Sequence, residues 1–218
     1  MRPTRRSFLA AAGTAATGAL AGCTGRLTAE GAAFAASGAT LPERVQVETG
    51  YTHHRTDDST VSQRFEWYGI GRTVDVTNVV AEYDRAVELD LLGRRIQAAV
   101  FAALATPKVR LLGREYNPVA GMSTAELAEL VQERYDEFDV AGARENYAWT
   151  VAGSGTTVTR FDAEAQLLAV GRPVDVHLYV SGAVEVGGDF LVTLSVHPQA
   201  FGRRESTVRR LMGAVEPA

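Results

Sequence analysis

Few side chains in this sequence are grouped in a way that could support chemistry, and the first such group is a pair of histidines. His53 and His54 lie shortly before Asp57 and Asp58. Imidazole and carboxylate groups are metal ligands, but neighbouring residues of a strand point to opposite faces. Both histidines could bind one ion only if this segment were a loop. We therefore interpret the group as polar residues on a solvated strand edge and predict no metal site.

A second group consists of Asp175, His177 and His197. Asp175 and His177 are two residues apart, so they share one face of an expected strand. A histidine beside a carboxylate, with a second histidine on the neighbouring strand, could act in acid–base catalysis or bind a metal. Whether this site forms depends on the register of the two strands.

Hairpin geometry predicts that register. If Gly187-Gly188 is a two-residue turn, His177 lies opposite Pro198 and His197 lies opposite Leu178. The two histidines then face opposite sides of the sheet. We expect no His–Asp–His site unless a bulge shifts the register by one residue.

Ser154 lies between two glycines, but its surroundings do not resemble those of a catalytic nucleophile. The stretch Ala152-Gly153-Ser154-Gly155 lacks the second spacer of Gly-x-Ser-x-Gly. It is also expected between two strands, whereas the nucleophile elbow joins a strand to a helix. We interpret it as a turn and predict no catalytic residue here.

The only cysteine, Cys23, indicates lipid attachment. Leu20-Ala21-Gly22-Cys23 resembles a lipobox, which implies cleavage between Gly22 and Cys23 and a lipid on the sulfur. One acyl chain holds a protein only marginally, so stable anchoring needs two chains on Cys23 or a second membrane contact. Without a later cysteine, the mature chain has no intramolecular disulfide and no thiol catalysis.

The segment before Cys23 is typical of an export signal. Arg5 and Arg6 lie in Thr4-Arg5-Arg6-Ser7-Phe8-Leu9, which resembles the twin-arginine signal read by a translocase for folded proteins. The uncharged run 7–22 would form a helix of about 24 Å, shorter than the ~30 Å hydrocarbon core of a membrane. We expect export, followed by lipid anchoring at the outer face of the cytoplasmic membrane.

Composition restricts the partners. Residues 1–22 contain three arginines and no acid, so their removal leaves 19 basic and 26 acidic residues, a net charge of −7. This balance argues against nucleic acid as a partner. Lys108 is the only lysine. Acidity with almost no lysine is typical of salt-loving archaea, although a GC-rich genome gives the same preference for arginine.

The chain is expected to have three parts. Residues 1–22 form the signal peptide, 23–38 the lipidated cysteine and a short tether, and 39–218 a single domain. The alternative is two halves that meet near Gly142, each pairing its own strands.

The first half of this domain contains mostly strand patterns. A first strand is expected near 27–34, and a short helix begins after Pro42 and closes at Gly50. The runs 61–68 and 73–83, with glycines between them, predict a long hairpin. The apolar run 96–105 fits a buried strand or a buried helix, and its central Val100 and Phe101 favour the strand.

The second half is expected to hold two helices and a meander. A capping box at Ser123 begins a helix whose apolar positions continue to Phe138. Strands at 147–151, 156–170, 173–181 and 190–197 form an antiparallel meander, and a closing helix covers 203–215. This order predicts an α+β fold: an antiparallel sheet, made of the long hairpin and the meander, with two or three helices packed on it.

Several segments resemble an uncharacterised family of haloarchaeal lipoproteins that are exported through the twin-arginine pathway. They are 49–51, 79–84, 101–107, 115–119 and 158–161, with the sequences TGY, VVAEYD, FAALATP, EYNPV and VTRF. The resemblance covers nearly the whole mature chain. It implies export, anchoring and a single α+β domain, and it implies no activity and no cofactor.

The sequence therefore favours a lipid-anchored binding or structural module without a catalytic site or cofactor. The partner, a protein or a small molecule, is not specified by any motif. The alternative is an extracellular hydrolase or carbohydrate-active enzyme that uses a pair of carboxylates, because the 26 acidic residues allow many such pairs.

Overall fold

The computed structural model describes residues 26–27, 31–67, 70–89, 94–111, 114–115, 117–134, 138–167 and 172–218. Arg5, Arg6, Gly22 and Cys23, which carry the expected export signal and lipid, lie outside the described residues. Among the helices of the described ranges, none has the length and apolar character needed to cross a membrane.

Strands dominate the chain. The strands are β1 (Arg26–Leu27), β2 (Gly31–Ala35), β3 (Ala39–Thr40), β4 (Thr52–Trp67), β5 (Ile70–Leu89), β6 (Arg94–Pro107), β7 (Arg110–Leu111), β8 (Arg114–Glu115), β9 (Phe138–Val151), β10 (Ser154–Leu167), β11 (Arg172–Ser181), β12 (Val184–Val186), β13 (Asp189–Pro198) and β14 (Glu216–Pro217). The α-helices are α1 (Glu43–Thr49), α2 (Thr124–Arg134) and α3 (Glu205–Gly213), and two 3-10 helices, η2 (Pro118–Gly121) and η3 (Gln199–Phe201), complete the order.

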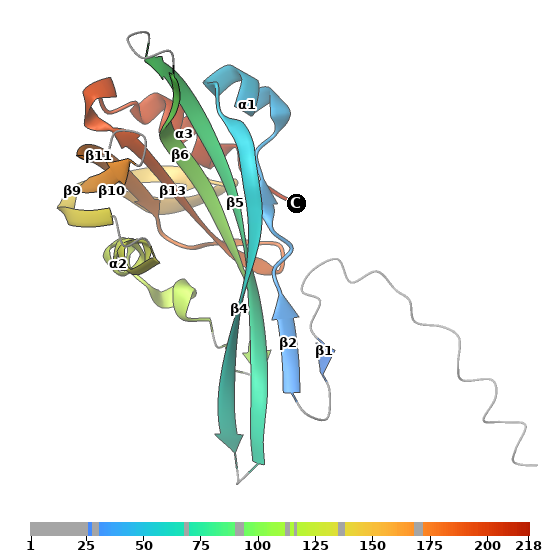
Figure 1. The fold of residues 1–218 in the computed structure, drawn as a ribbon. Helices are drawn as coiled ribbons and strands as arrows, with labels where there is room; N and C mark the ends of the chain where they lie inside the picture. The colour runs from blue at the N-terminus through green and yellow to red at the C-terminus, as the bar shows by residue number, and fades with distance from the viewer. Residues whose placement is uncertain are drawn as a thin grey trace, which may run out of the picture.

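Ten of these strands form one sheet in the order β1-β2-β5-β6-β13-β11-β10-β9, with β4 on β5 and β12 on β13. All of its pairings are antiparallel except that of β2 with β5. β2 pairs with residues 73–77 of β5, and β6 pairs with residues 79–89 of the same strand. The β4–β5 hairpin therefore extends past β6 as a long ribbon (Figure 1). One sheet runs through both halves of the chain.

The expected α+β class is wrong, because the fold is dominated by its sheet. The three α-helices hold only 7, 11 and 9 residues, whereas β4 and β5 alone hold 16 and 20. The apolar run 96–105, left open between strand and helix, lies in β6 and pairs with β5 and β13 on its two sides. Such double-sided pairing within a sheet covered on both faces explains why its sequence is almost continuously apolar.

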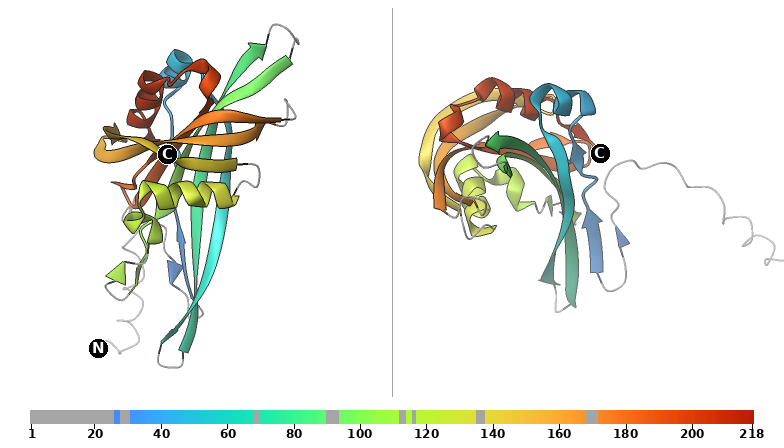
Figure 2. Two further views of the ribbon diagram at one scale, coloured as in Figure 1. Left: turned by 90° about the vertical axis from the view of Figure 1, so that its left-hand side faces the viewer. Right: turned by 45° about the horizontal axis from the view of Figure 1, so that its top comes forward.

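The helices cover opposite faces of the sheet, with α1 and α3 on one face and α2 on the other (Figures 1 and 2). We name these the α3 face and the α2 face. The core on the α3 face includes Val45, Tyr83, Phe101, Trp149, Val151, Tyr179, Leu191, Val208, Leu211 and Met212. The core on the α2 face includes Leu127, Ala128, Phe161, Ala163, Val176, Leu178, Val180 and Val192.

Local signals placed the helices well. In the predicted capping box, the Glu126 carboxylate accepts from the Ser123 backbone N–H at 2.7 Å and the Ser123 hydroxyl accepts from the Glu126 N–H at 3.3 Å. Gly50 closes α1 in the left-handed conformation (φ 74°). The helix after Ser123 was predicted too long, because α2 ends at Arg134 and Phe138 begins β9.

The turns also follow their sequences. Ala152 (φ 47°) and Gly153 (φ 83°) form the two-residue turn between β9 and β10, so Ser154 begins a strand. The structural role expected for this stretch is confirmed. The predicted β4–β5 hairpin is present, but Ile70 and Gly71, expected in its turn, already pair with Trp67 and Glu66.

Candidate functional site

The structure places His177 and His197 side by side, against the register predicted from the sequence. They lie directly opposite each other on β11 and β13. Their ring centroids are 5.7 Å apart in an edge-on arrangement. Both belong to the α3 face, and the prediction that they face opposite sides of the sheet is wrong.

A bulge explains the difference. The turn at Gly187-Gly188 has the expected register, with Val186 opposite Asp189, but it joins β12 to β13. Val180 faces Leu194 and Val184 faces Leu191, so residues 181–183 oppose only residues 192–193. This extra residue shifts β11 by one position.

Side-chain contacts hold the bulge in place. The Ser181 hydroxyl accepts from the backbone N–H of Thr193 at 2.8 Å. The N–H of Gly182 turns to the neighbouring strand and donates to the carbonyl of Thr157 at 2.8 Å. A Cβ atom at Gly182 would lie 2.8 Å from the Thr156 hydroxyl oxygen, so any side chain there would force Thr156 to move.

The carboxylate beside His177 is Asp162, because Asp175 lies exposed opposite Glu164. Asp162 pairs with His177 across β10 and β11, and its Oδ1 lies 3.2 Å from His177 Nδ1. Arg160, two residues earlier on β10, donates from Nη1 to the same Asp162 oxygen at 2.9 Å.

Arg160 links this pair to β9. Its side chain is only 6% exposed, and its Nη2 donates to Glu145 Oε1 at 3.2 Å. Its Nη1 also lies 3.2 Å from His177 Nδ1, which can accept this hydrogen bond when the imidazole is neutral. The planar guanidinium thus contacts three partners at once. We name Glu145, Arg160, Asp162, His177 and His197 the arginine–histidine cluster.

The start of α3 adds a second carboxylate to the solvent side of this cluster. The Tyr147 hydroxyl lies 2.5 Å from Glu145 Oε2 and 2.9 Å from Glu205 Oε1. Arg203 Nη1 is 3.0 Å from Glu145 and 3.8 Å from Glu205. Glu145 and Glu205 are each 37% exposed, so this edge of the cluster is open to water.

Aromatic rings form the wall behind the cluster. Tyr147 stacks on Trp149 with ring centroids 4.6 Å apart, and Trp149 stacks on Tyr179 at 6.0 Å. Tyr179 in turn stacks on His197 at 5.6 Å, and its hydroxyl donates to the carbonyl of Arg203 at 2.9 Å. These contacts fix the rings of the cluster from the apolar side.

His197 is the unusual member of the cluster. It is 1% exposed, and neither ring nitrogen makes a hydrogen bond of regular geometry, although the backbones of Gly202 and Arg203 interact with the ring. Burial, and then the neighbouring His177, lower the pKa of His197 to about 4, although the backbone of Arg203 and Gly202 nearby offsets part of this effect. The ring is therefore neutral at pH 7, with an unpaired donor and an unpaired acceptor inside the protein.

Glu145, Asp162 and Tyr147 are held in their ordinary charge states. The hydrogen bond from Tyr147 is the main reason why the pKa of Glu145 is lowered. Burial alone would raise the pKa of Asp162, but Arg144 and Arg160 outweigh it and keep that pKa low. Burial and the two nearby carboxylates raise the pKa of the Tyr147 hydroxyl. None of these groups is prepared to donate or accept a proton near neutral pH.

The histidines near the start of β4 have separate partners. His53 Nε2 lies 2.9 Å from the Thr56 hydroxyl, and His54 Nδ1 lies 3.5 Å from Asp84 Oδ2. The register of β4 shifts between His53 and Arg55. In the part of the chain that the structure describes, no three histidine, cysteine or acidic side chains are grouped so that they could hold a metal ion.

Sequence reasoning missed Glu145, Arg160 and Asp162. A signal was present, because Arg160, Asp162 and Glu164 alternate with apolar residues along β10 and so share one face of the strand. The other two acids of the site, Glu145 on β9 and Glu205 at the start of α3, come from distant parts of the chain.

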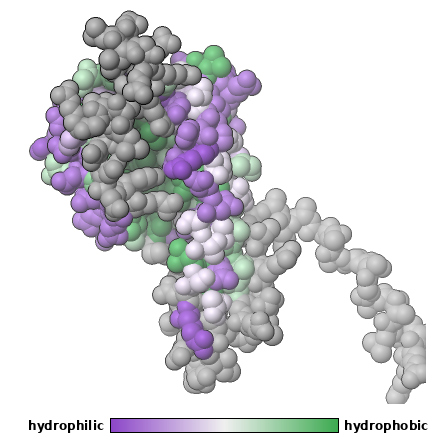
Figure 3. All heavy atoms as spheres, viewed as in Figure 1, coloured by the Kyte–Doolittle hydropathy of each residue, from purple (hydrophilic) through white to green (hydrophobic). Residues whose placement is uncertain are grey.

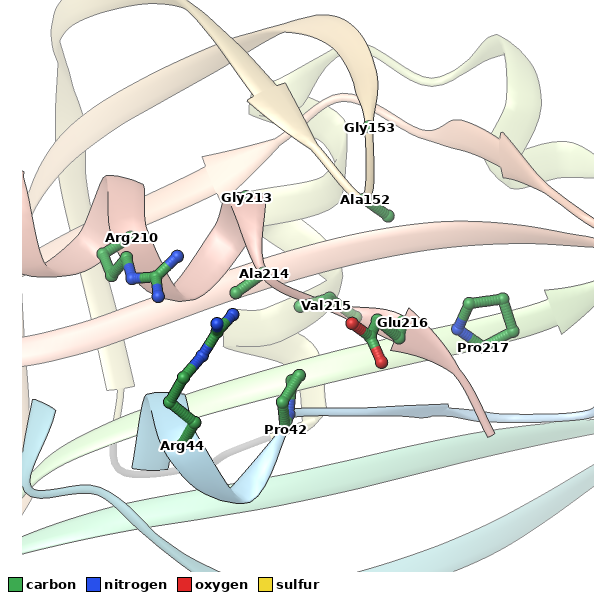
Figure 4. A pocket seen from close by; sticks show the side chains of 10 residues that line it. All are labelled: Pro42, Arg44, Ala152, Gly153, Arg210, Gly213, Ala214, Val215, Glu216 and Pro217. Atoms are coloured by element: carbon green, nitrogen blue, oxygen red, sulfur yellow. The ribbon is translucent and has the colours of Figure 1, made fainter. Parts of the chain in front are cut away.

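A shallow pocket of about 350 Å³ lies elsewhere, where α1, the β9–β10 turn and the last residues of the chain meet (Figure 4). Arg44 and Arg210 extend into it from two helices, and Glu216 lies on its opposite side. Both arginines contact Glu48, at 3.9 and 2.8 Å. Two cations are thus balanced by two acids, and the pocket favours no particular ligand.

The fold and the site define a domain dominated by one sheet, with a charged cluster buried under one of its faces. Residues 38–216 match the family model described as domain of unknown function (DUF6517), and the chain belongs to this family. The resemblance to an uncharacterised family is thereby confirmed. No curated protein and no solved structure matches the chain.

Proposed function

We propose that this protein is an exported, lipid-anchored binding module whose recognition site is the open edge of the arginine–histidine cluster. Two lines of reasoning support the proposal. The first is the leader, with Arg5 and Arg6 before a short apolar run and Cys23 after Gly22. The second is the chemistry of the cluster.

The observation that carries the binding role is His197. Most buried polar groups have a hydrogen-bond partner, so a fully buried imidazole with two unpaired nitrogens calls for a specific explanation. It lies at the inner end of a row of paired charges that reaches solvent at Glu145 and Glu205. A site of this kind suits a polar ligand that both donates and accepts hydrogen bonds.

The same chemistry argues against catalysis. Hydrolysis by a carboxylate pair needs one acid with a raised pKa. The pKa of Glu145 is instead lowered, and Arg203 contacts both Glu145 and Glu205. The charges are therefore neutralised inside the cluster, and no group is left as an activated nucleophile.

A hydrolase stays the second candidate because Glu145 and Glu205 both reach the Tyr147 hydroxyl. Their nearest oxygens are no farther apart than the sum of 2.5 and 2.9 Å. Retaining glycosidases place their carboxyl groups about 5–5.5 Å apart. The two candidates differ in one measurable property, which is turnover.

Lipid labelling tests the anchor. We expect wild-type protein to incorporate labelled lipid and to sediment with membranes, and Cys23→Ser to do neither. Replacing both Arg5 and Arg6 by lysine should retain unprocessed protein in the cytoplasm, because the translocase reads the arginine pair. A Cys23→Ser protein that stays membrane-bound, or a mature chain that starts at another residue, would contradict the anchor.

Turnover decides between the binding module and the hydrolase. The full chain is incubated with a panel of nitrophenyl glycosides and esters, beside Glu205→Gln and the control Glu216→Gln, whose residue is exposed and outside the cluster. We expect no hydrolysis by any of the three proteins. Hydrolysis that Glu205→Gln abolishes and Glu216→Gln retains would establish the hydrolase in place of the binding module.

A further inference from the structure

A second pocket lies between α1 and α3. It has a volume of about 520 Å³ and opens broadly to solvent, and we name it the α1–α3 pocket. Many ligand sites in proteins have volumes of about 300–1,000 Å³. At the end of the molecule where α1 lies (Figure 1), Figure 3 shows hydrophilic residues beside one hydrophobic patch. The lining of the pocket is similar, because all of its residues except Val47 and Gly50 have polar or charged side chains.

The lining of this pocket holds more cations than anions. Arg85 reaches it from β5 and Arg210 from α3, whereas Glu48 is the one acidic side chain in the lining. Glu48 is already bound by Arg210 at 2.8 Å and by Arg44 at 3.9 Å. Its charge is therefore neutralised, and Arg85 is left without a counterion in a chain that is acidic as a whole. The charges of the pocket thus favour an anion as the ligand.

Arg85 is the distinctive residue of the pocket. It is partly buried, and among the residues that the structure describes its guanidinium has neither a carboxylate partner nor a hydrogen bond. Its side chain packs against Gly50 at the end of α1, where a Cβ atom would lie 3.5 Å from Arg85 Nε. A cation that is partly removed from water without a partner loses hydration and gains no ion pair. Its planar donors match the two oxygens of a carboxylate or phosphate group.

A second arginine adds to the positive potential beside the pocket. Burial raises the pKa of the Tyr51 hydroxyl, and the nearby Ser195 hydroxyl offsets part of that rise. Arg85 and Arg204 offset it further, so both guanidinium groups act on one buried side chain. Arg204 lies over the ring of Phe201 and, within the described ranges, also lacks a carboxylate partner. Positive charge is therefore concentrated near the start of α3, which favours a negative ligand there.

The first turn of α3 supplies further donors. Ser206 and Thr207 line the pocket there. Arg204 occupies the N-cap position without a side-chain hydrogen bond to the turn, although the Thr207 N–H donates to its carbonyl at 3.0 Å. Hydroxyl groups and the N–H groups of a first turn can both donate to an anion. They add hydrogen bonds to the charge that Arg85 supplies.

We propose that the α1–α3 pocket binds a small oxyanion, held by the guanidinium of Arg85 and by the hydroxyl groups of Ser206 and Thr207. The group that the pocket recognises is a carboxylate or a phosphate, because both offer the paired oxygens that a guanidinium binds. None of the lining residues belongs to the arginine–histidine cluster. The pocket is therefore a second site, and it is independent of the function proposed above.

Titration calorimetry at constant ionic strength tests the site. The full chain carrying Cys23→Ser is titrated with inorganic phosphate and phenyl phosphate in one arm, and with acetate and benzoate in the other. We expect saturable binding in at least one arm, and the tighter arm identifies the group. Arg85→Met should weaken this binding about tenfold or more, because charge-assisted hydrogen bonds are lost. The matched control is Arg209→Met, which removes an exposed cation of α3 outside the pocket and should change the affinity less than about twofold.

Thermal unfolding gives a second readout that also shows whether each variant folds. A bound anion raises the Tm, and this rise should be absent in Arg85→Met and retained in Arg209→Met. Arg85→Lys keeps the charge but loses the planar donors, so it should bind more weakly than the wild type and more tightly than Arg85→Met. Absence of saturable binding by all four probes up to about 10 mM, a range that includes weak sites, would overturn the proposal. So would binding that Arg85→Met and Arg209→Met weaken equally, because the anion would then respond to the general charge of the surface.

Discussion

The two faces of strands β10, β11 and β13 differ in chemistry, although successive residues of the same three strands supply both faces. On the α2 face, Phe161, Leu178 and Val192 pack against α2 without a buried charge. On the α3 face, Arg160, His177 and His197 lie at equivalent depth among stacked aromatic rings. The α2 face provides packing, and the α3 face combines packing with a polar network.

The polar face contains groups whose hydrogen bonds are incomplete. Buried charges stabilise a fold only when their hydrogen bonds are complete, and an apolar core of similar shape is often as stable. The cluster leaves both nitrogens of His197 and Nε of Arg160 without partners. These unpaired groups are the ones that the binding role proposed above would use.

The largest effect is expected on the apolar face. Leu178 is fully buried there, so Leu178→Ala should lower the free energy of unfolding by about 3 kcal/mol through lost contacts and a cavity. Leu130 on α2, 42% exposed, is the matched control and should cost less than about 1 kcal/mol. Chemical denaturation at two pH values measures both. If the loss of unfolding free energy in Leu178→Ala depended on pH, the α2 face would not differ from the α3 face in the way described here.

A smaller, pH-dependent effect is expected from the cluster. Arg160→Met should lower the free energy of unfolding by about 2 kcal/mol at pH 7, less than a fully buried pair would, because Glu145 and Asp162 are partly exposed. Both acids have lowered pKa values, so their stabilisation is present above the ordinary carboxyl range and disappears as the pH falls through the folded-state pKa. The loss should therefore shrink in acid.

The control for Arg160 is Arg144, which binds the same Asp162 at 2.7 Å from an exposed position. Arg144→Met should cost less than about 1 kcal/mol, as exposed ion pairs do. Denaturant titration from pH 7 to pH 3 compares the two variants. Equal costs would mean that burial of the guanidinium is not what distinguishes the α3 face.

The smallest effect at pH 7 concerns His197 alone, whose contribution to stability changes only in acid. Its folded-state pKa of about 4 lies below that of an unfolded histidine, so the unfolded chain binds more protons between about pH 6.5 and 4. Because one pKa unit corresponds to about 1.36 kcal/mol, stability should fall by about 3 kcal/mol as the pH drops through this window. His197→Phe keeps the stacking on Tyr179 and should remove that slope, whereas His54→Ala on the exposed strand β4 should not.

Thermal unfolding at a series of pH values measures this slope of stability against pH. If the slope is unchanged in His197→Phe, the acid sensitivity belongs to other groups. A loss of stability at pH 7 in the same variant would be equally informative. It would indicate that the ring nitrogens are hydrogen-bonded in the folded protein, which would remove the observation on which the proposed binding role rests.

The candidate site was only partly accessible to prediction because its parts come together through long-range pairing. His177 and His197 were singled out as chemically interesting, but their register was predicted from the nearest turn. The bulge at residues 181–183 depends on the Ser181 hydroxyl and on the neighbouring strand β10, which no local rule includes. A shift of one residue moves a side chain to the other face of the sheet. The one-residue error in the predicted register therefore placed His177 and His197 on opposite faces and made the prediction of the site wrong.

The sequence by itself determined the features that short segments control. The capping box at Ser123, the left-handed Gly50 and the Ala152-Gly153 turn each act within a few residues, where local hydrogen bonds and backbone sterics are sufficient. The expected tether at Cys23 has the same local character. Only the tertiary structure decided that the fold is dominated by its sheet and that Glu145 meets Glu205 on Tyr147. Strand register and helix docking depend on contacts between residues far apart in the chain, and those contacts form only when the whole sheet assembles.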